Sequence, residues 1–267
     1  MSDLLPPEKD WRFFLSHYYL EDFWEIPRAL RFLAILDQSA APPEFWGPGE
    51  VLVGKYDRAE LERYLLANQD PKESRPPLQL KRTAPPRYRA NLNVGNGVHP
   101  HSFHLVADLR HREGELPELF TLADTLASSL DLEFGTIDIN REGQDPATRM
   151  LRSGMTPNLD IYIELGFDTL FVRNYFGLRL VRCAGGPQAF AVGGAIVRPF
   201  ANGTLAVDLH ATPWLADPAD LKAAQQQVLP ALRASTGLFY APKKPHQLYP
   251  GTPGPNWQSP PGARWPK

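Results

Sequence analysis

Hydrophobic and polar residues alternate most regularly in residues 87–94, RYRANLNV, where one face is apolar and the other carries arginine and asparagine. This period of two predicts a strand with one buried and one solvated face. The same alternation predicts strands over residues 103–110 and 159–165. Residues 10–20, which are rich in Phe and Tyr, and residues 134–139 are also strand-like.

Helical spacing alternates with these strands. Residues 116–130 place leucine, phenylalanine and alanine on one stripe, as in an amphipathic helix. Residues 26–38 predict a second helix that begins near Pro27. Asp57 and Glu60 form a capping-box pattern, which predicts that a third helix begins there.

The C-terminal third contains a hairpin signal and two helix signals. Asn202–Gly203 is a preferred two-residue turn, and pairing across it would place Phe200 opposite Leu205. Aromatic residues spaced by three and four favour a helix over residues 167–177. Asp217 predicts the start of a final helix, which Pro230 is expected to kink or shorten.

Because helices and strands interleave, we expect an α+β fold with an antiparallel or mixed sheet and helices packed on one side. No repeat decides whether the fold has two related halves. The expected divisions are an N-terminal α/β segment (1–69), a Pro-rich connector (70–86), a main α+β region (87–240) that can be continuous with 1–69, and a Pro-rich extended tail (241–267).

Composition restricts the classes of partner. The 267 residues are 43% hydrophobic and carry a formal net charge of -2, which argues against a broad basic surface for nucleic acid. No apolar run approaches the length of a bilayer span, and the N-terminus lacks the apolar core of a signal peptide. The single Cys183 suits a reducing compartment. We therefore expect a cytoplasmic protein with neither membrane nor nucleic acid as partner.

A histidine-rich stretch is the first candidate for chemistry. His99, His101 and His104 lie within residues 98–110 and could be zinc ligands of a metal-dependent hydrolase. On a strand, however, His104 points to the face opposite His99 and His101. We therefore expect no metal site and no cofactor.

Other polar groups favour structure over catalysis. A thiol nucleophile at Cys183 with His210 has no local support. Carboxylates on predicted strands are most simply solvated faces. Of two basic clusters, the second is interleaved with aromatic residues, a combination that can bind single-stranded nucleic acid or form a protein interface, but these aromatics fall at core spacing. These groups are the carboxylates Asp138, Asp160, Glu164 and Asp208, the cluster Lys81, Arg82, Arg87 and Arg89, and the cluster Arg173, Arg179 and Arg182.

Residues 165–182, LGFDTLFVRNYFGLRLVR, precede a glycine hairpin and an Asp/Pro-led helix. This order resembles bacterial polymorphic-toxin immunity proteins, in particular the immunity-protein 52 family and related type VI immunity families. Phe167 stands where the family has tryptophan. The positions that carry the resemblance are Gly166, Phe167, Tyr175, Phe176 and Gly177.

The resemblance implies a non-catalytic protein that binds a cognate toxin, plausibly a nuclease, and occludes its active site. Acidic side chains could then oppose a basic toxin cleft. The alternatives are the histidine-dependent hydrolase and an accessory subunit of a secretion or phage-like assembly that docks through its tail. The candidate interface residues are Glu113, Glu115, Glu118, Glu142 and Asp145.

Overall fold

A ten-stranded antiparallel sheet runs through the molecule in the order β3-β2-β4-β5-β6-β1-β7-β8-β10-β9. The computed structural model describes residues 12–20, 23, 25–49, 54–68, 77–93, 101–108, 113–140, 162, 164–240 and 252–261. The strands are β1 (Arg12–Tyr19), β2 (Phe45–Pro48), β3 (Gly54–Lys55), β4 (Leu78–Arg82), β5 (Tyr88–Asn93), β6 (His101–Asp108), β7 (Leu132–Asn140), β8 (Arg173–Phe176), β9 (Ile196–Pro199) and β10 (Leu205–Asp208).

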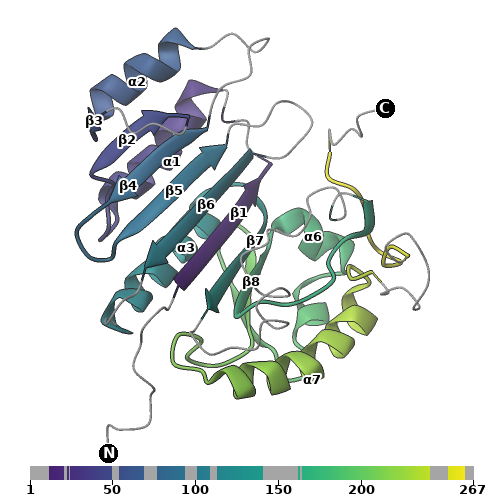
Figure 1. Cartoon of the computed structure of the whole chain (residues 1–267). Helices are drawn as coiled ribbons and strands as arrows, with labels where there is room; N and C mark the ends of the chain where they lie inside the picture. The colour runs from purple at the N-terminus through teal and green to yellow at the C-terminus, as the bar shows by residue number, and fades with distance from the viewer. Residues whose placement is uncertain are drawn as a thin grey trace, which may run out of the picture.

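The expected α+β class is confirmed, with every strand pair of the sheet antiparallel. Helices α1 (Ile26–Gln38) and α3 (Leu116–Ser129) lie behind the sheet in Figure 1, and α7 (Pro218–Thr236) lies in front of its C-terminal part. The helices are α1 (Ile26–Gln38), α2 (Arg58–Ala67), α3 (Leu116–Ser129), α6 (Leu178–Cys183) and α7 (Pro218–Thr236). None of the described helices combines the length and apolar character that a bilayer crossing needs.

Helices α1 and α3 cover one face of the sheet. The ring of Phe13 on β1 contacts Phe120 of α3, with ring centroids 5.7 Å apart. Further along the same face of β1, Tyr19 contacts Phe32 of α1. Aromatic pairs of this kind add to the burial of apolar area, which is the main force holding a helix against a sheet.

Within the described part of the chain, helical cover on the opposite face lies over the C-terminal strands. Phe176 of β8 packs on Phe190 with ring centroids 4.8 Å apart, and helix α7 lies beyond that layer. The helix is tied to its neighbours where Gln225 donates to the carbonyl of Leu170. The expectation of helices on one side therefore describes α1 and α3, and α7 adds a partial second layer.

The two predicted helix N-caps are confirmed, whereas the expected shortening of the last helix at Pro230 is not. The Asp57 side chain accepts a hydrogen bond from the Glu60 backbone N–H at the start of α2. Asp217 caps α7 in the same way through Ala219. Pro230 was expected to kink or shorten that helix, but the helix continues to Thr236.

Other local predictions are wrong where the residues are described. Residues Arg173–Phe176 form strand β8 instead of a helix, because aromatic residues here are buried on both faces of a strand. Tyr162, inside a segment expected to be a strand, is helical. The hairpin register is also shifted by one residue, since Leu205 pairs with Pro199 and not with Phe200. A one-residue shift exchanges the two faces of a strand.

Two segments at the expected divisions belong to the main body. Leu78–Arg82, placed within the Pro-rich connector, form β4 between β2 and β5. In the C-terminal tail, Trp257 packs on Tyr162 and Phe167, with ring centroids 4.9 and 5.8 Å away. The tryptophan thus docks onto its own domain, which hides its apolar surface from water.

Candidate interaction surface

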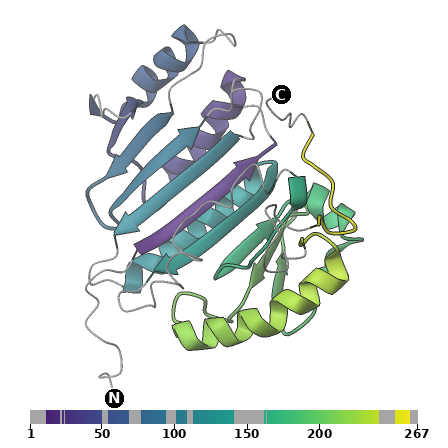
Figure 2. The same ribbon diagram turned by 45° about the vertical axis from the view of Figure 1, so that its right-hand side comes forward.

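Among the residues that the structure describes, no helix lies over strands β6, β5, β4 and β2 on the face of the sheet opposite α1 (Figures 1 and 2). Paired residues of antiparallel strands lie on the same face, so the register aligns one side chain per strand in a row. The row across six strands is Phe14, Val106, Arg89, Lys81, Phe45 and Lys55. We call these residues the open row.

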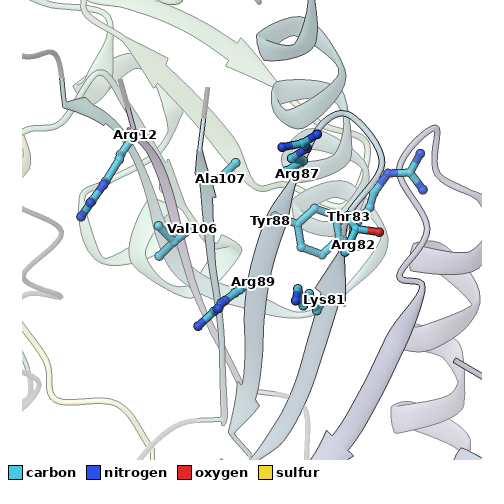
Figure 3. A pocket seen from close by; sticks show the side chains of 9 residues that line it. All are labelled: Arg12, Lys81, Arg82, Thr83, Arg87, Tyr88, Arg89, Val106 and Ala107. Carbon is cyan, nitrogen blue, oxygen red and sulfur yellow. The ribbon is translucent and has the colours of Figure 1, made fainter. Parts of the chain in front are cut away.

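A groove of about 630 Å³ lies on this face. Five of its nine described lining residues are cationic and none of the nine is acidic. Lys81 and Arg89 belong by register to the open face, whereas Arg82 pairs with Tyr88 in the row that faces α3. Figure 3 shows that the cations come from β1, β4, β5 and the β4–β5 connection. The nine residues are Arg12, Lys81, Arg82, Thr83, Arg87, Tyr88, Arg89, Val106 and Ala107, and we call this site the basic groove.

Two like charges lie directly opposite each other in the basic groove. Lys81 of β4 pairs with Arg89 of β5 in the strand register. Like charges at directly opposite positions destabilise an antiparallel pair. Within the described residues, neither side chain forms an ion pair that would offset this repulsion.

The nearby carboxylate of Glu44 is committed elsewhere. It accepts hydrogen bonds from the hydroxyl and backbone N–H of Thr83 and from the backbone N–H of Ala84. The bond from the Thr83 side chain is the main cause that lowers the pKa of Glu44 below its usual value. Arg82 is committed as well, because it donates to the carbonyls of Pro42 and Pro85.

The apolar members of the open row are also accessible. Val106 is 41% exposed, although it lies in the middle of a sheet between Phe14 and Arg89. With the half-buried Phe14 and Phe45, Val106 gives the open row apolar surface beside its cations.

The histidines do not converge on a metal site within the described residues, where no group of three metal-ligating side chains is found. His104 Nδ1 lies 3.1 Å from Ser16 Oγ, and its Nε2 lies 3.0 Å from Ser102 Oγ. Both ring nitrogens are therefore occupied by hydroxyl groups, and burial lowers the pKa of His104 to about 4. His101 lies on the same strand, and His99 falls outside the described residues.

A second histidine, His17, lies on the opposite face of the sheet beneath α3. Burial is the main cause that lowers its pKa to about 3, and the neighbouring His104 adds to the effect. Its Nδ1 lies 3.0 Å from the hydroxyl of Tyr19. Because both pKa values are lowered, both histidines are neutral near pH 7. Nδ1 of His17 and both ring nitrogens of His104 form side-chain hydrogen bonds with hydroxyl groups on the sheet.

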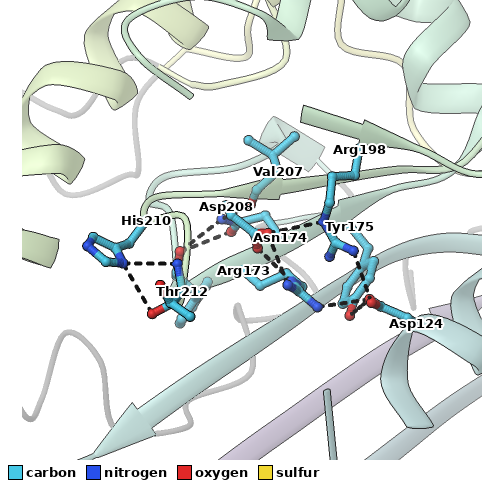
Figure 4. A network of polar contacts seen from close by, with 10 residues as sticks. Asp124, Arg173, Asn174, Tyr175, Arg198, Val207, Asp208, His210 and Thr212 are labelled. Atoms are coloured by element: carbon cyan, nitrogen blue, oxygen red, sulfur yellow. Dashed lines mark hydrogen bonds and ion pairs between the residues drawn. The ribbon is translucent and has the colours of Figure 1, made fainter. Parts of the chain in front are cut away.

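A charge network with a buried Arg173–Asp208 pair at its centre links α3 to the C-terminal strands (Figure 4). Arg173 holds Asp208 in a bidentate pair at 2.6 and 3.0 Å and reaches Asp124 of α3 at 2.9 Å. Arg198 contacts the same two carboxylates, and Tyr175 donates to Asp124. The positive charges of the two arginines balance the negative charges of the two aspartates. The network therefore holds α3 against the C-terminal strands.

A second buried cluster fixes the C-terminal segment. The carboxylate of Glu133 is completely buried and accepts from Arg179 at 2.9 Å and from the Tyr162 hydroxyl at 2.8 Å. Arg179 also donates to the carbonyl of Gln258 and lies over the Trp257 ring. Arg173 and Arg179, two of the arginines that the sequence placed among aromatic residues, therefore serve internal structure, whereas Arg182 is exposed on α6.

The acidic residues proposed from the sequence as interface candidates lie away from the basic groove where they are described. Glu118 is exposed in the first turn of α3, and Glu115 is half-buried at the cap of the same helix. Glu113 lies in the short 3-10 helix before it, whereas Glu142 and Asp145 lie outside the described residues. The described acidic candidates thus cluster at one helix start, separate from the lining of the basic groove.

The other groups considered as catalytic are separated or engaged. Asp208 is held by two arginines, Asp138 is buried in β7, and Glu164 is exposed. His210 Nδ1 lies 3.1 Å from the backbone of Thr212. Cys183 and Asp160 add no site, since Cys183 is a half-buried free thiol and Asp160 lies outside the described residues.

Sequence reasoning found only part of the basic groove. The cluster Lys81, Arg82, Arg87 and Arg89 is visible because its members are close in the chain. Arg12 was missed, since β6 lies between its strand and β5. The alternation of residues 87–94 was the available signal, because it placed Arg87 and Arg89 on a solvated face.

This chain is similar to known proteins in its fold, and no family is assigned by its sequence. No protein-family model matches the chain, and no curated protein matches it. The solved structure of the Pseudomonas aeruginosa T6SS protein PA0821 is similar to this chain with a TM-score of 0.53 and 13% sequence identity. The match covers 92% of this chain and 80% of that chain. At this identity the likeness shows a shared fold.

Proposed function

We propose that this chain is a non-catalytic immunity protein of a bacterial type VI secretion system, which binds a cognate toxin in the cytoplasm and blocks its active site. The open, cationic face of the sheet is the observation that carries this proposal. It offers a broad accessible surface with unpaired charge among the described residues, as a protein-binding site does.

Two further observations support the proposal. The similar fold belongs to a protein of the type VI secretion system, whose name suggests the cellular context. The buried charged groups of the C-terminal half are paired in Arg–Asp and Arg–Glu clusters. Such pairing suits a rigid scaffold, and a rigid scaffold keeps the ordering cost of binding low.

The proposal is tested with the purified chain and the toxin encoded beside it. We expect a 1:1 complex in size-exclusion chromatography with light scattering, and complete loss of toxin activity at one equivalent. The toxin surface should be blocked without any change in its covalent structure. Toxin activity that persists at saturating amounts of the chain, or inhibition at catalytic amounts, would contradict the proposal.

A further inference from the structure

We infer that the basic groove binds an extended acidic segment of the protein partner. The inference rests on the proposed function and specifies the chemistry of its contact. It names the carboxylates of the partner as the groups that the guanidinium and ammonium groups of the groove recognise.

Charge complementarity is the first argument. Arg12, Lys81, Arg87 and Arg89 line the groove, and within the described residues none of them is neutralised by an ion pair. The whole chain nevertheless has a net charge of -2. The cations are thus concentrated on one face, where they attract a negative partner and raise its rate of association.

The like-charge pair is the second argument. Lys81 and Arg89 repel each other in the free chain because they are directly opposite on neighbouring strands. A carboxylate that sits between them removes this repulsion when the partner binds. The pair therefore lowers the folding stability of the free chain. Relief of the repulsion makes the binding free energy of an acidic partner more favourable.

The shape of the site is the third argument. The open row crosses six strands, and five strand spacings of about 4.8 Å give a length of about 24 Å. An extended segment of about seven residues has the same length at about 3.3 Å per residue. The basic groove occupies the β4, β5, β6 and β1 part of this row. The open row as a whole is thus long enough for one peptide segment lying across the strands.

The mixture of apolar and cationic side chains within the open row favours a protein over a nucleic acid. Its cations Arg89 and Lys81 lie between the apolar side chains of Val106 and Phe45. A peptide can match this order with acidic and apolar side chains, whereas a nucleic acid presents an unbroken line of phosphates. The nucleic acid is therefore kept as a competing occupant in the test.

The test uses the full chain and a fluorescent Glu/Leu peptide of about ten residues, with binding followed by anisotropy. The variant Lys81→Glu/Arg89→Glu reverses two charges in the groove, and Lys222→Glu/Arg182→Glu makes the same change at two exposed positions on α7 and α6. We expect the groove variant to bind at least about tenfold more weakly and the control to match the wild type within about twofold. Raising salt should weaken wild-type binding and affect the groove variant less.

Three results would overturn the inference. The first is equal peptide binding by the groove variant, and the second is tighter binding of a single-stranded DNA of the same charge. The third is stronger peptide binding after Asp3→Asn/Glu8→Gln/Asp10→Asn, which would make the acidic N-terminus of the chain itself the occupant. Circular dichroism confirms that each variant folds. If the groove variant still inhibits the toxin fully, the groove inference fails and the immunity function stands, whereas failure of the wild type to inhibit rejects the immunity function.

Discussion

Replacing Lys81 with glutamate should stabilise the free protein while it weakens partner binding. The change converts the like-charge pair with Arg89 into an opposite-charge pair at the same cross-strand position. Most substitutions that remove a binding group leave stability unchanged or lower it. A gain in stability together with a loss of binding would show that the charge pair is kept for the partner.

The expected gain follows from the register. Directly opposite Cβ atoms are about 4.5–5.5 Å apart, and one such charge pair contributes roughly 0.2–1 kcal/mol. Arg89 is exposed and Lys81 is half-buried, so solvent screening keeps the total change at about 0.5–1 kcal/mol. For a chain of this size that corresponds to about 1–4 °C in Tm.

The assay is thermal unfolding of the wild type, Lys81→Glu and the control Lys222→Glu at low salt, repeated at high salt. We expect the Tm of Lys81→Glu to rise, that of Lys222→Glu to stay close to the wild type, and the difference to shrink in high salt because the repulsion is screened. A Tm of Lys81→Glu below the wild type at low salt would refute the argument that the two cations repel each other.

Three further outcomes test the internal structure. Arg179→Ala should cost about 3–5 kcal/mol in urea unfolding, because it leaves the buried carboxylate of Glu133 without its cation; a cost below about 1 kcal/mol would contradict this. Because the pKa of His104 is lowered to about 4 and its unfolded value is about 6.5, stability should fall as pH drops from about 6.5 to 4, by at most about 1.4 kcal/mol per unit for this residue. His104→Asn should make that pH profile shallower, and an unchanged profile would reject the role of this histidine. Gly177→Ala should lower the Tm and the soluble yield, since the added Cβ would lie 1.7 Å from the Leu132 carbonyl oxygen, and a wild-type Tm would show that the backbone can yield.

Elements with a local cause could be predicted from the sequence. The alternation of Tyr88–Asn93 and the apolar stripe of α3 each record a single buried face, and both elements form as expected. The caps at Asp57 and Asp217 depend on residues only two or three positions away. Such signals survive in the folded chain because no distant contact opposes them.

Elements buried on both faces were harder to predict. All four residues of β8 are buried, so the period of two disappears and the aromatic spacing is compatible with a helix. The β9–β10 register depends on the network around Asp208 as well as on the turn. The strand conformation of β8 and the register of β9 and β10 depend on contacts between segments that are distant in the sequence. A local pattern of residues carries no information about such contacts.

The candidate surface also combines residues that the sequence identifies with residues that only the fold brings together. The alternation in residues 87–94 identifies Arg89 as solvent-facing, but its partner Lys81 becomes its neighbour only through strand pairing. Arg12 joins them from the N-terminus through a strand order that the sequence does not reveal. The acidic residues near Glu118 were chosen for their charge alone, and whether they contact a partner stays a prediction.

Growth of cells that co-express the toxin encoded beside this gene is the most direct test that the chain acts by binding through its open cationic face. We expect wild type and Lys222→Glu/Arg182→Glu to restore growth and Lys81→Glu/Arg89→Glu, produced at the same soluble level, to leave the cells unprotected. Full protection by the folded groove variant would show that the partner is held elsewhere.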